Sequence, residues 1–195
     1  MFDIVTRFEN EIAEYFGAPY AVSTDCCTHA IELCIRYTKT KKISIPKHSY
    51  VSVPMTAMKL NIDWSWREEE WKDFYCLNNK IIDAAVLWKK NSYIPGTFMC
   101  LSFQFKKHLP LGRGGMILTD DKTAYEELIK LGYDGRTRDK PWAEQDITSI
   151  GYHYYMTPET AQLGLDKLPN AIKTPPRRIT WKDYPDLSLR NFHPL

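Results

Sequence analysis

Residues 101–121 read LSFQFKKHLPLGRGGMILTDD, and this stretch decides how the chain folds. Two apolar runs flank the glycine turn Gly112–Gly115, which predicts a strand hairpin. Lys107 lies between the first run and the turn, five residues after Ser102. A lysine held on a short, desolvated loop can act as a nucleophilic amine, and a nearby serine can bind a phosphate of the same ligand. Spacing alone also allows two surface lysines, Lys106 and Lys107, beside a hairpin.

The rest of the chain alternates short apolar runs with helical patterns. Over residues 2–16 the apolar side chains recur at steps of three and four, which indicates an amphipathic helix. Thr157 followed by Pro158 is typical of a helix start, with the threonine as N-cap. The patterns predict helices over 2–16, 28–37, 51–60, 123–131 and 157–171, and strands over 20–24, 41–45, 80–85, 97–103 and 116–119. This alternation favours an α/β fold with a parallel sheet.

Three stretches lie outside these patterns. Residues 63–79 combine tryptophans with charged residues and show no clean period, and residues 133–150 are polar and loop-like. From residue 173 onward, prolines and arginines predict an extended tail. We therefore divide the chain into a compact domain over 1–172 and a tail over 173–195.

Composition excludes several classes of protein. The 195 residues are 44% hydrophobic and 13% aromatic, which is enough for one core and argues against disorder. A net charge of +2 makes no case for a nucleic-acid or membrane-surface partner. The apolar runs are far shorter than the roughly 20 residues that span a bilayer. The first residues lack the apolar core of a signal peptide.

The five cysteines are Cys26, Cys27, Cys34, Cys76 and Cys100. An odd number, without a secretion signal, indicates reduced thiols and a cytoplasmic protein. The grouping of three cysteines with His29 invites a zinc interpretation, but its spacing fits no usual paired-ligand pattern. We expect no metal site.

Residues 101–121 resemble the lysine segment of the DegT–StrS family of nucleotide-sugar aminotransferases, which are fold type I pyridoxal-phosphate enzymes. The family pattern is Ser-Phe-His-x-x-Lys-Asn, a short spacer, Gly-x-Gly-Gly, and a strand that ends in Thr-Asp-Asp. Lys107 matches the family's cofactor lysine, and Lys106 does not. Gln104 stands at the family's histidine and His108 at its asparagine. Neither change removes the amine.

Further blocks match the family in the same order between residues 8 and 172. The resemblance implies that Asp83 pairs with the pyridine nitrogen of pyridoxal phosphate and that Tyr50 stacks on the ring. It implies that Thr28, His29 and Ser102 bind the phosphate. In the family, an asparagine reaches across a dimer interface to the partner's phosphate. His153 holds that position here.

Several positions depart from the family pattern. Cys27 replaces a glycine at the phosphate-binding helix, Val86 replaces a residue that contacts the cofactor's phenolic oxygen, and Tyr155 replaces an arginine. The chain is roughly half the family's usual length. The stretch between Tyr50 and Asp83 is much shorter, and the small C-terminal domain is missing after about residue 173.

The resemblance implies a three-layer sandwich with a mostly parallel central sheet, like the large domain of fold type I transferases. It implies an aminotransferase in which Lys107 and Asp83 are catalytic, with pyridoxal phosphate as cofactor. The substrates would be a nucleotide-linked keto-sugar and an amino-acid donor, and the protein would be a homodimer. The alternative is a catalytically reduced relative that serves as a cofactor-binding or structural protein.

Overall fold

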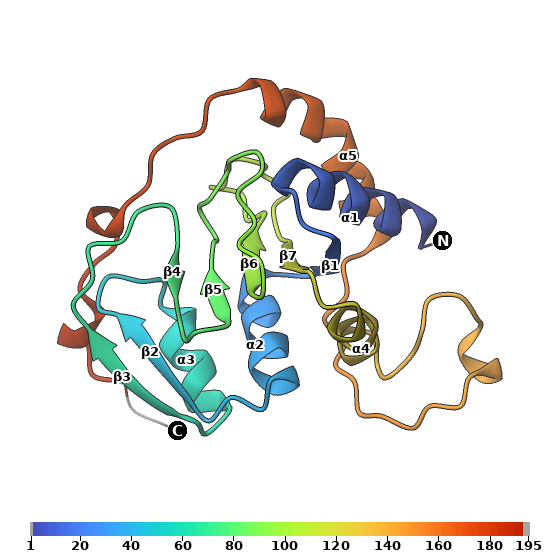
Figure 1. Cartoon of the computed structure of the whole chain (residues 1–195), viewed down its shortest axis with the longest axis horizontal. Coiled ribbons are helices and arrows are strands. Elements are labelled where there is room, and N and C mark those ends of the chain that lie inside the picture. The colour runs from blue at the N-terminus through green and yellow to red at the C-terminus, as the bar shows by residue number, and fades with distance from the viewer. Residues whose placement is uncertain (1, 193–195) are drawn as a thin grey trace.

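The computed structural model describes residues 2–192 and has three layers, with helices on both faces of a central sheet (Figure 1). The helices are α1 (Asp3–Phe16), α2 (Cys27–Tyr37), α3 (Ser52–Lys59), α4 (Lys122–Gly132) and α5 (Pro158–Lys173). The strands are β1 (Tyr20–Thr24), β2 (Lys42–Pro46), β3 (Asp63–Arg67), β4 (Tyr75–Cys76), β5 (Ile81–Asp83), β6 (Phe98–Ser102) and β7 (Gly115–Thr119).

Alternate side chains of the central strands contribute to two hydrophobic cores. In β6, Met99 and Leu101 join a core with α1 and α5, whereas Phe98 and Cys100 join a second core with α2, α3 and α4. Successive side chains of a strand point to opposite faces, so the cores lie on opposite sides of the sheet. This confirms the α/β class and the three-layer sandwich.

The sheet is mixed, which corrects the expectation of a mostly parallel one. The strand order is β1-β7-β6-β5-β4, and only β5 and β6 pair in parallel within it. Residues 77–80 alone join β4 to β5, and a parallel connection needs about a dozen residues, so this pair has to be antiparallel. β2 and β3 form a separate parallel pair.

The predicted helices and their caps are confirmed. Thr157 caps α5 by accepting a hydrogen bond from the N–H of Thr160, and Pro158 occupies its first turn. α1 ends at Gly17, whose φ of 75° suits a glycine. None of the described helices is long and apolar enough to cross a bilayer.

Two strands within residues 63–79 were not predicted. β3 reads Asp-Trp-Ser-Trp-Arg, and the tryptophans of this stretch alternate with polar residues as a half-buried strand requires. β4 is only two residues long, too short for any periodic pattern to show. The predicted hairpin around Gly112–Gly115 is confirmed, because β6 and β7 pair antiparallel.

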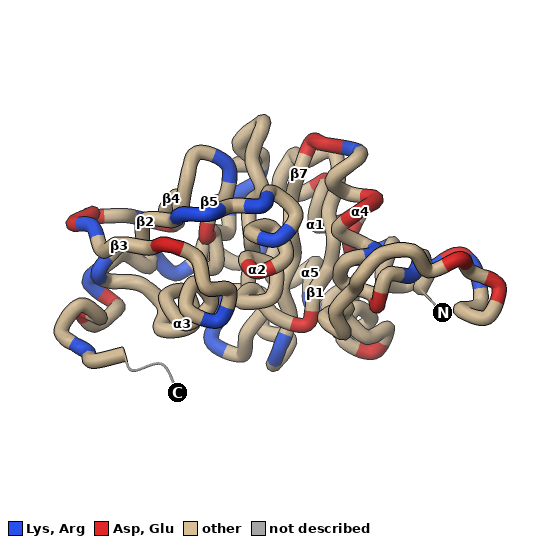
Figure 2. Tube along the Cα trace, turned by 90° about the horizontal axis from the view of Figure 1, so that it is seen from below, with Lys and Arg blue, Asp and Glu red and all other residues tan. Residues whose placement is uncertain are grey.

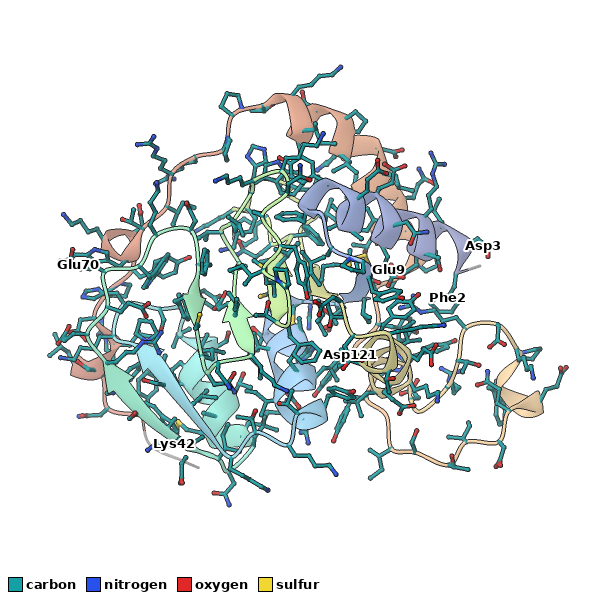
Figure 3. All side chains as sticks on the ribbon, in the orientation of Figure 1. Phe2, Asp3, Glu9, Lys42, Glu70 and Asp121 are labelled. Atoms are coloured by element: carbon teal, nitrogen blue, oxygen red, sulfur yellow. The ribbon has the colours of Figure 1, made fainter. Side chains whose placement is uncertain are left out.

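A long loop follows α4 and projects from the body of the molecule (Figure 1). Both basic and acidic residues occur along it (Figure 2). Its base is fixed by Glu9, which lies on the inner side of α1 (Figure 3) and accepts hydrogen bonds from Arg138 (2.8 Å) and from the N–H and hydroxyl of Ser23 (2.7 Å each). Glu9 is buried, so this ion pair joins the loop, α1 and β1.

The chain after α5 turns back along the sheet edge at β4, and its last described residues lie beside β3 (Figure 1). Residues 175–179 form no helix or strand, and two short 3-10 turns follow at Trp181–Asp183 and Leu187–Leu189. This C-terminal segment, residues 174–192, packs on the molecule. Residues 193–195 of the expected tail lie outside the described residues.

Candidate functional site

One cavity of about 750 Å³ opens at the carboxyl ends of β5 and β6. The first turns of α2 and α3 border it, together with the loop after β6 and the C-terminal segment. The cavity brings together five of the expected site residues: Thr28, Tyr50, Asp83, Ser102 and Lys107. The other two expected residues, His29 and His153, are not among the described residues that line this cavity.

Lys107 lies on the loop between β6 and β7. The N–H of Phe105 donates to the carbonyl oxygen of Gly112 at 3.1 Å, which closes the base of the loop. Lys107 is half-buried, whereas Lys106 is exposed, with its ammonium 5.6 Å from the ring centre of Phe105. Lys107 is also the lysine whose charge acts on the carboxyl of Asp83. The two neighbouring lysines therefore have different surroundings.

Asp83 is the last residue of β5 and is only 4% exposed. Its carboxylate accepts hydrogen bonds from the hydroxyl of Tyr75 (2.5 Å) and the N–H of Ala85 (3.0 Å). Burial raises the pKa of Asp83, and the two hydrogen bonds and the charge of Lys107 oppose that rise. A buried carboxylate open to a cavity is suited to bind a cationic ring nitrogen. Tyr75 was not identified from the sequence.

The first turn of α2 offers donors for an anion. The N–H groups of Cys27, Thr28 and His29 have no acceptor among the described residues, and a helix N-terminus favours negative charge. The hydroxyl of Thr28 lies 2.7 Å from that of Ser52, in the first turn of α3. Ser52 also lines the cavity and was missed because its sequence context gives it no motif.

Gly115, the first residue of β7, lets this strand approach the start of α2. A Cβ there would lie 2.5 Å from the carbonyl carbon of Cys26 and 2.6 Å from the backbone nitrogen of Cys27. Both neighbours are backbone atoms, so any larger side chain would separate the strand from the helix. The Gly-Gly of the lysine segment thus shapes the anion-binding end of the cavity.

His29 is occupied elsewhere. Its Nδ1 is 2.6 Å from a carboxylate oxygen of Asp25, and its ring stacks on Tyr154 at 3.6 Å between centroids. Burial opposes protonation, but hydrogen bonds to Asp25 and Cys26 outweigh it and raise the pKa of His29 to about 9. The ring is therefore protonated at neutral pH. Its Nδ1 is engaged by Asp25, and the His29 side chain does not line the cavity.

Asp25, Cys26 and His29 also place three potential metal-ligand atoms within 4.8 Å of one another. The guanidinium of Arg113 pairs with Asp25 at 2.7 Å. This cation and the protonated His29 ring occupy the carboxylate that a metal ion would need, so the cluster is satisfied without one.

His153 lies away from the cavity of its own chain. Its side chain is 71% exposed and hydrogen-bonds to Asp134 at 3.0 Å. The implied role of this position concerns a partner subunit, which a single chain does not contain.

The C-terminal segment forms one wall of the cavity. Its lining residues are Arg177, Ile179, Asp183, Tyr184, Pro185 and Leu187. Tyr50, at 52% exposure, lies at the rim and also lines the cavity. Burial raises the pKa of the Tyr184 hydroxyl, and the charge of Asp83 adds to that rise. The sequence analysis described this segment only as an extended tail and did not place it at the cavity.

This wall is tied to the tryptophan-rich stretch. The N–H of Trp181 donates to the carbonyl oxygen of Trp71 (3.1 Å), and the Trp71 indole N–H donates to that of His48 (2.6 Å). His48 Nδ1 in turn lies 2.7 Å from the carbonyl oxygen of Tyr184. A sequence signal existed: Thr180 and Asp183 have the spacing of a capping box, which the structure forms.

Pyridoxal phosphate fits these residues. The cavity offers a half-buried lysine amine for its aldehyde, a buried carboxylate for its ring nitrogen, and unsatisfied helix N–H groups with hydroxyls for its phosphate. These three features are on different elements and meet only in the folded chain.

The fold is that of the pyridoxal-phosphate-dependent sugar aminotransferases. Similar solved structures include AtS13 from Actinomadura melliaura (TM-score 0.74, 16% identity, 87% of this chain and 60% of that one). Helicobacter pylori PseC, an aminotransferase involved in the biosynthesis of pseudoaminic acid, gives a TM-score of 0.72 at 16% identity, over 88% of this chain and 58% of that one. The pyridoxal-phosphate form of a sugar aminotransferase described as putative, Spr1654 from Streptococcus pneumoniae, gives 0.72 at 17% identity, over 87% and 60%.

The chain belongs to the DegT/DnrJ/EryC1/StrS aminotransferase family, whose model matches residues 2–95 and 94–193. It spans about 60% of the length of the solved structures named above. A search of curated proteins found no match.

Proposed function

We propose that this protein binds pyridoxal phosphate through Lys107 and transfers an amino group from an amino acid to a nucleotide-linked keto-sugar. The observation that carries the proposal is that Lys107, Asp83 and the first turn of α2 border one cavity. The bound cofactor would supply an electron sink for the carbon that loses a proton.

The residues of the chain itself have separate roles in the proposed reaction. The N–H groups at the start of α2 hold the phosphate, with the hydroxyls of Thr28, Ser52 and Ser102. Tyr50 covers the ring from the rim, and Asp83 keeps a proton on the ring nitrogen. The amine of Lys107 would take a proton from the donor's α-carbon and would deliver a proton to the sugar carbon that receives the amino group. The donor leaves as a 2-oxo acid, and the sugar carbonyl becomes an amine.

Labelling of Lys107 tests the proposal. The protein is incubated with pyridoxal phosphate, reduced with borohydride and mapped by peptide mass spectrometry. We expect the adduct on Lys107, none in Lys107→Ala, and an unchanged adduct in the matched control Lys106→Ala. An adduct on Lys106, or none in the unmodified protein, would overturn the assignment.

Asp83 provides the test of turnover. Asp83→Asn should still form the Lys107 adduct, but amino transfer should fall on the order of 100-fold or more, because an amide does not hold the ring proton. Undiminished transfer in this variant would remove Asp83 from the catalytic residues.

A second candidate is a relative that binds the cofactor without turnover. It is supported by Val86, which has no polar group for the cofactor's phenolic oxygen. An adduct on Lys107 with no transfer to any nucleotide-linked keto-sugar would favour it. In either case the five free thiols suit a reducing compartment, and we place the protein in the cytoplasm.

The proposed active form is a homodimer. Tyr50, Met55 and Phe105 are at least half exposed, and two of them border the cavity, so a second copy would cover apolar surface at its mouth. His153 would then face the partner's phosphate. Light scattering should give twice the 22.8 kDa chain mass, and His153→Ala should weaken cofactor binding. A single 22.8 kDa species with unchanged affinity in that variant would contradict the dimer.

A further inference from the structure

A second, smaller cavity of about 280 Å³ adjoins the first, and Lys107 lines both. The two cavities share part of their lining, including Ser102, Lys106, Lys107 and Arg177. The rest of the second lining comes from the chain after β5, from the loop after Lys107 and from Pro175. A molecule in this cavity would therefore lie next to the lysine amine while the first cavity is filled.

The charge of the second cavity has one sign. The ionisable side chains that line it are Lys106, Lys107, His108 and Arg177, and no carboxylate is among the described lining residues. The Nε2 of His108 is 2.8 Å from the carbonyl oxygen of Ala171 and orients that ring. Once Lys107 is bonded to a cofactor, Lys106 and Arg177 remain as cations. The cavity is thus suited to an anion.

Arg177 is positioned for this role by the C-terminal segment. Its guanidinium has one partner among the described residues, Asp183, at 3.5 Å, so most of its N–H groups remain for a ligand. Asp183 is itself held by the N–H of Thr180 at 2.9 Å. Both Arg177, at 81% side-chain exposure, and the adjacent Arg178 are exposed, but Arg178 lines neither cavity. Two neighbouring arginines therefore differ in position but not in charge.

The geometry points to a carboxylate subsite formed by Arg177 and Lys106, which binds the amino-acid donor and its 2-oxo acid product. This inference rests on the proposed function. The cavity is slightly smaller than the roughly 300–1,000 Å³ of drug-sized ligand sites, which suits an amino acid. Arginine forms paired hydrogen bonds to a carboxylate, which orients the ligand as well as attracting it. The C-terminal segment thus supplies a substrate contact in a chain that is shorter than its relatives.

Direct binding of 2-oxoglutarate to the cofactor-free, full-length protein tests the subsite by calorimetry. We expect Arg177→Gln to weaken binding at least tenfold and Arg178→Gln to leave it within about twofold. Lys106→Gln should weaken binding while leaving the Lys107 adduct intact. Equal affinities in the Arg177 and Arg178 variants, or no binding to the unmodified protein, would overturn the subsite.

The same variants separate this inference from the proposed function. Arg177→Gln should form the Lys107 adduct normally and require at least tenfold more amino acid for half-maximal transfer. Binding of 2-oxoglutarate that depends on Arg177 in a protein that forms no adduct would support the subsite and contradict the proposed function. A Lys107 adduct together with 2-oxoglutarate binding that does not depend on Arg177 would support the proposed function and contradict the subsite.

Discussion

The hydroxyl of Tyr75 donates a 2.5 Å hydrogen bond to Oδ2 of Asp83, and each residue is only 4% exposed. Tyr75 lies on β4, and the four residues 77–80 bring it directly beside β5. The shortened stretch before Asp83 therefore supplies the partner that orients this carboxylate. A buried carboxylate without such a donor would be costly, because charge is poorly solvated inside a protein.

Replacing Tyr75 by Phe should lower the free energy of unfolding by about 2 kcal/mol, the usual loss for a hydrogen bond to a charged group. The loss arises because Asp83 stays buried with one donor fewer. Urea unfolding followed by circular dichroism measures it. Tyr37→Phe is the matched control, since the Tyr37 hydroxyl has no hydrogen bond among the described residues. Equal stability of the two variants would show that the Tyr75 bond contributes nothing.

Asp83→Asn should stabilise the cofactor-free protein at neutral pH. Burial raises the pKa of Asp83 in the folded state, so the folded protein becomes less stable as the pH rises through that pKa and the carboxyl ionises. The amide stays neutral and still pairs with Tyr75 and Ala85. Unfolding free energies from about pH 4 to about pH 8 should therefore diverge between variant and unmodified protein, with the variant higher at neutral pH. Parallel curves would contradict a raised pKa.

His29 predicts a pH dependence on the alkaline side. Its folded pKa is about 9 and its ordinary value is 6.5, so its contribution is complete below about pH 6.5 and is lost as the pH rises through 9. The contribution is at most about 3 kcal/mol. His29→Gln should flatten the stability curve in that window. His153→Gln, at an exposed position, should retain the slope of the unmodified protein.

Gly115→Ala should lower stability by about 3 kcal/mol and weaken pyridoxal phosphate binding, because its Cβ would meet the backbone of Cys26 and Cys27. Gly132→Ala is the control: its Cβ would only touch Leu33 at 3.4 Å, and alanine favours a helix. Thermal unfolding and cofactor titration of both variants decide this. A Gly115→Ala protein that matches Gly132→Ala in both measurements would show that β7 can move away from α2 freely.

Much of the site was open to prediction because each of its parts is a local pattern. Thr28 opens a helix, Asp83 ends an apolar run, and Lys107 stands between a strand and a glycine turn. Such patterns identify the residue type and its element. They do not identify partners that come from elsewhere in the chain, and so Tyr75, Ser52 and Arg177 were missed.

The sequence by itself determined the α/β class, the helices and their caps, the β6–β7 hairpin and the resemblance to the aminotransferase family, since all of these follow from neighbouring residues. The tertiary structure alone decided the antiparallel setting of β4, the engagement of His29 by Asp25, and the return of the C-terminal segment over the cavity. Each of these depends on contacts between residues far apart in the chain. Such contacts are a short strand connection, an ion pair, or an indole N–H that donates to a distant carbonyl. They produce no periodic pattern in the sequence, because their partners come together only when the chain folds.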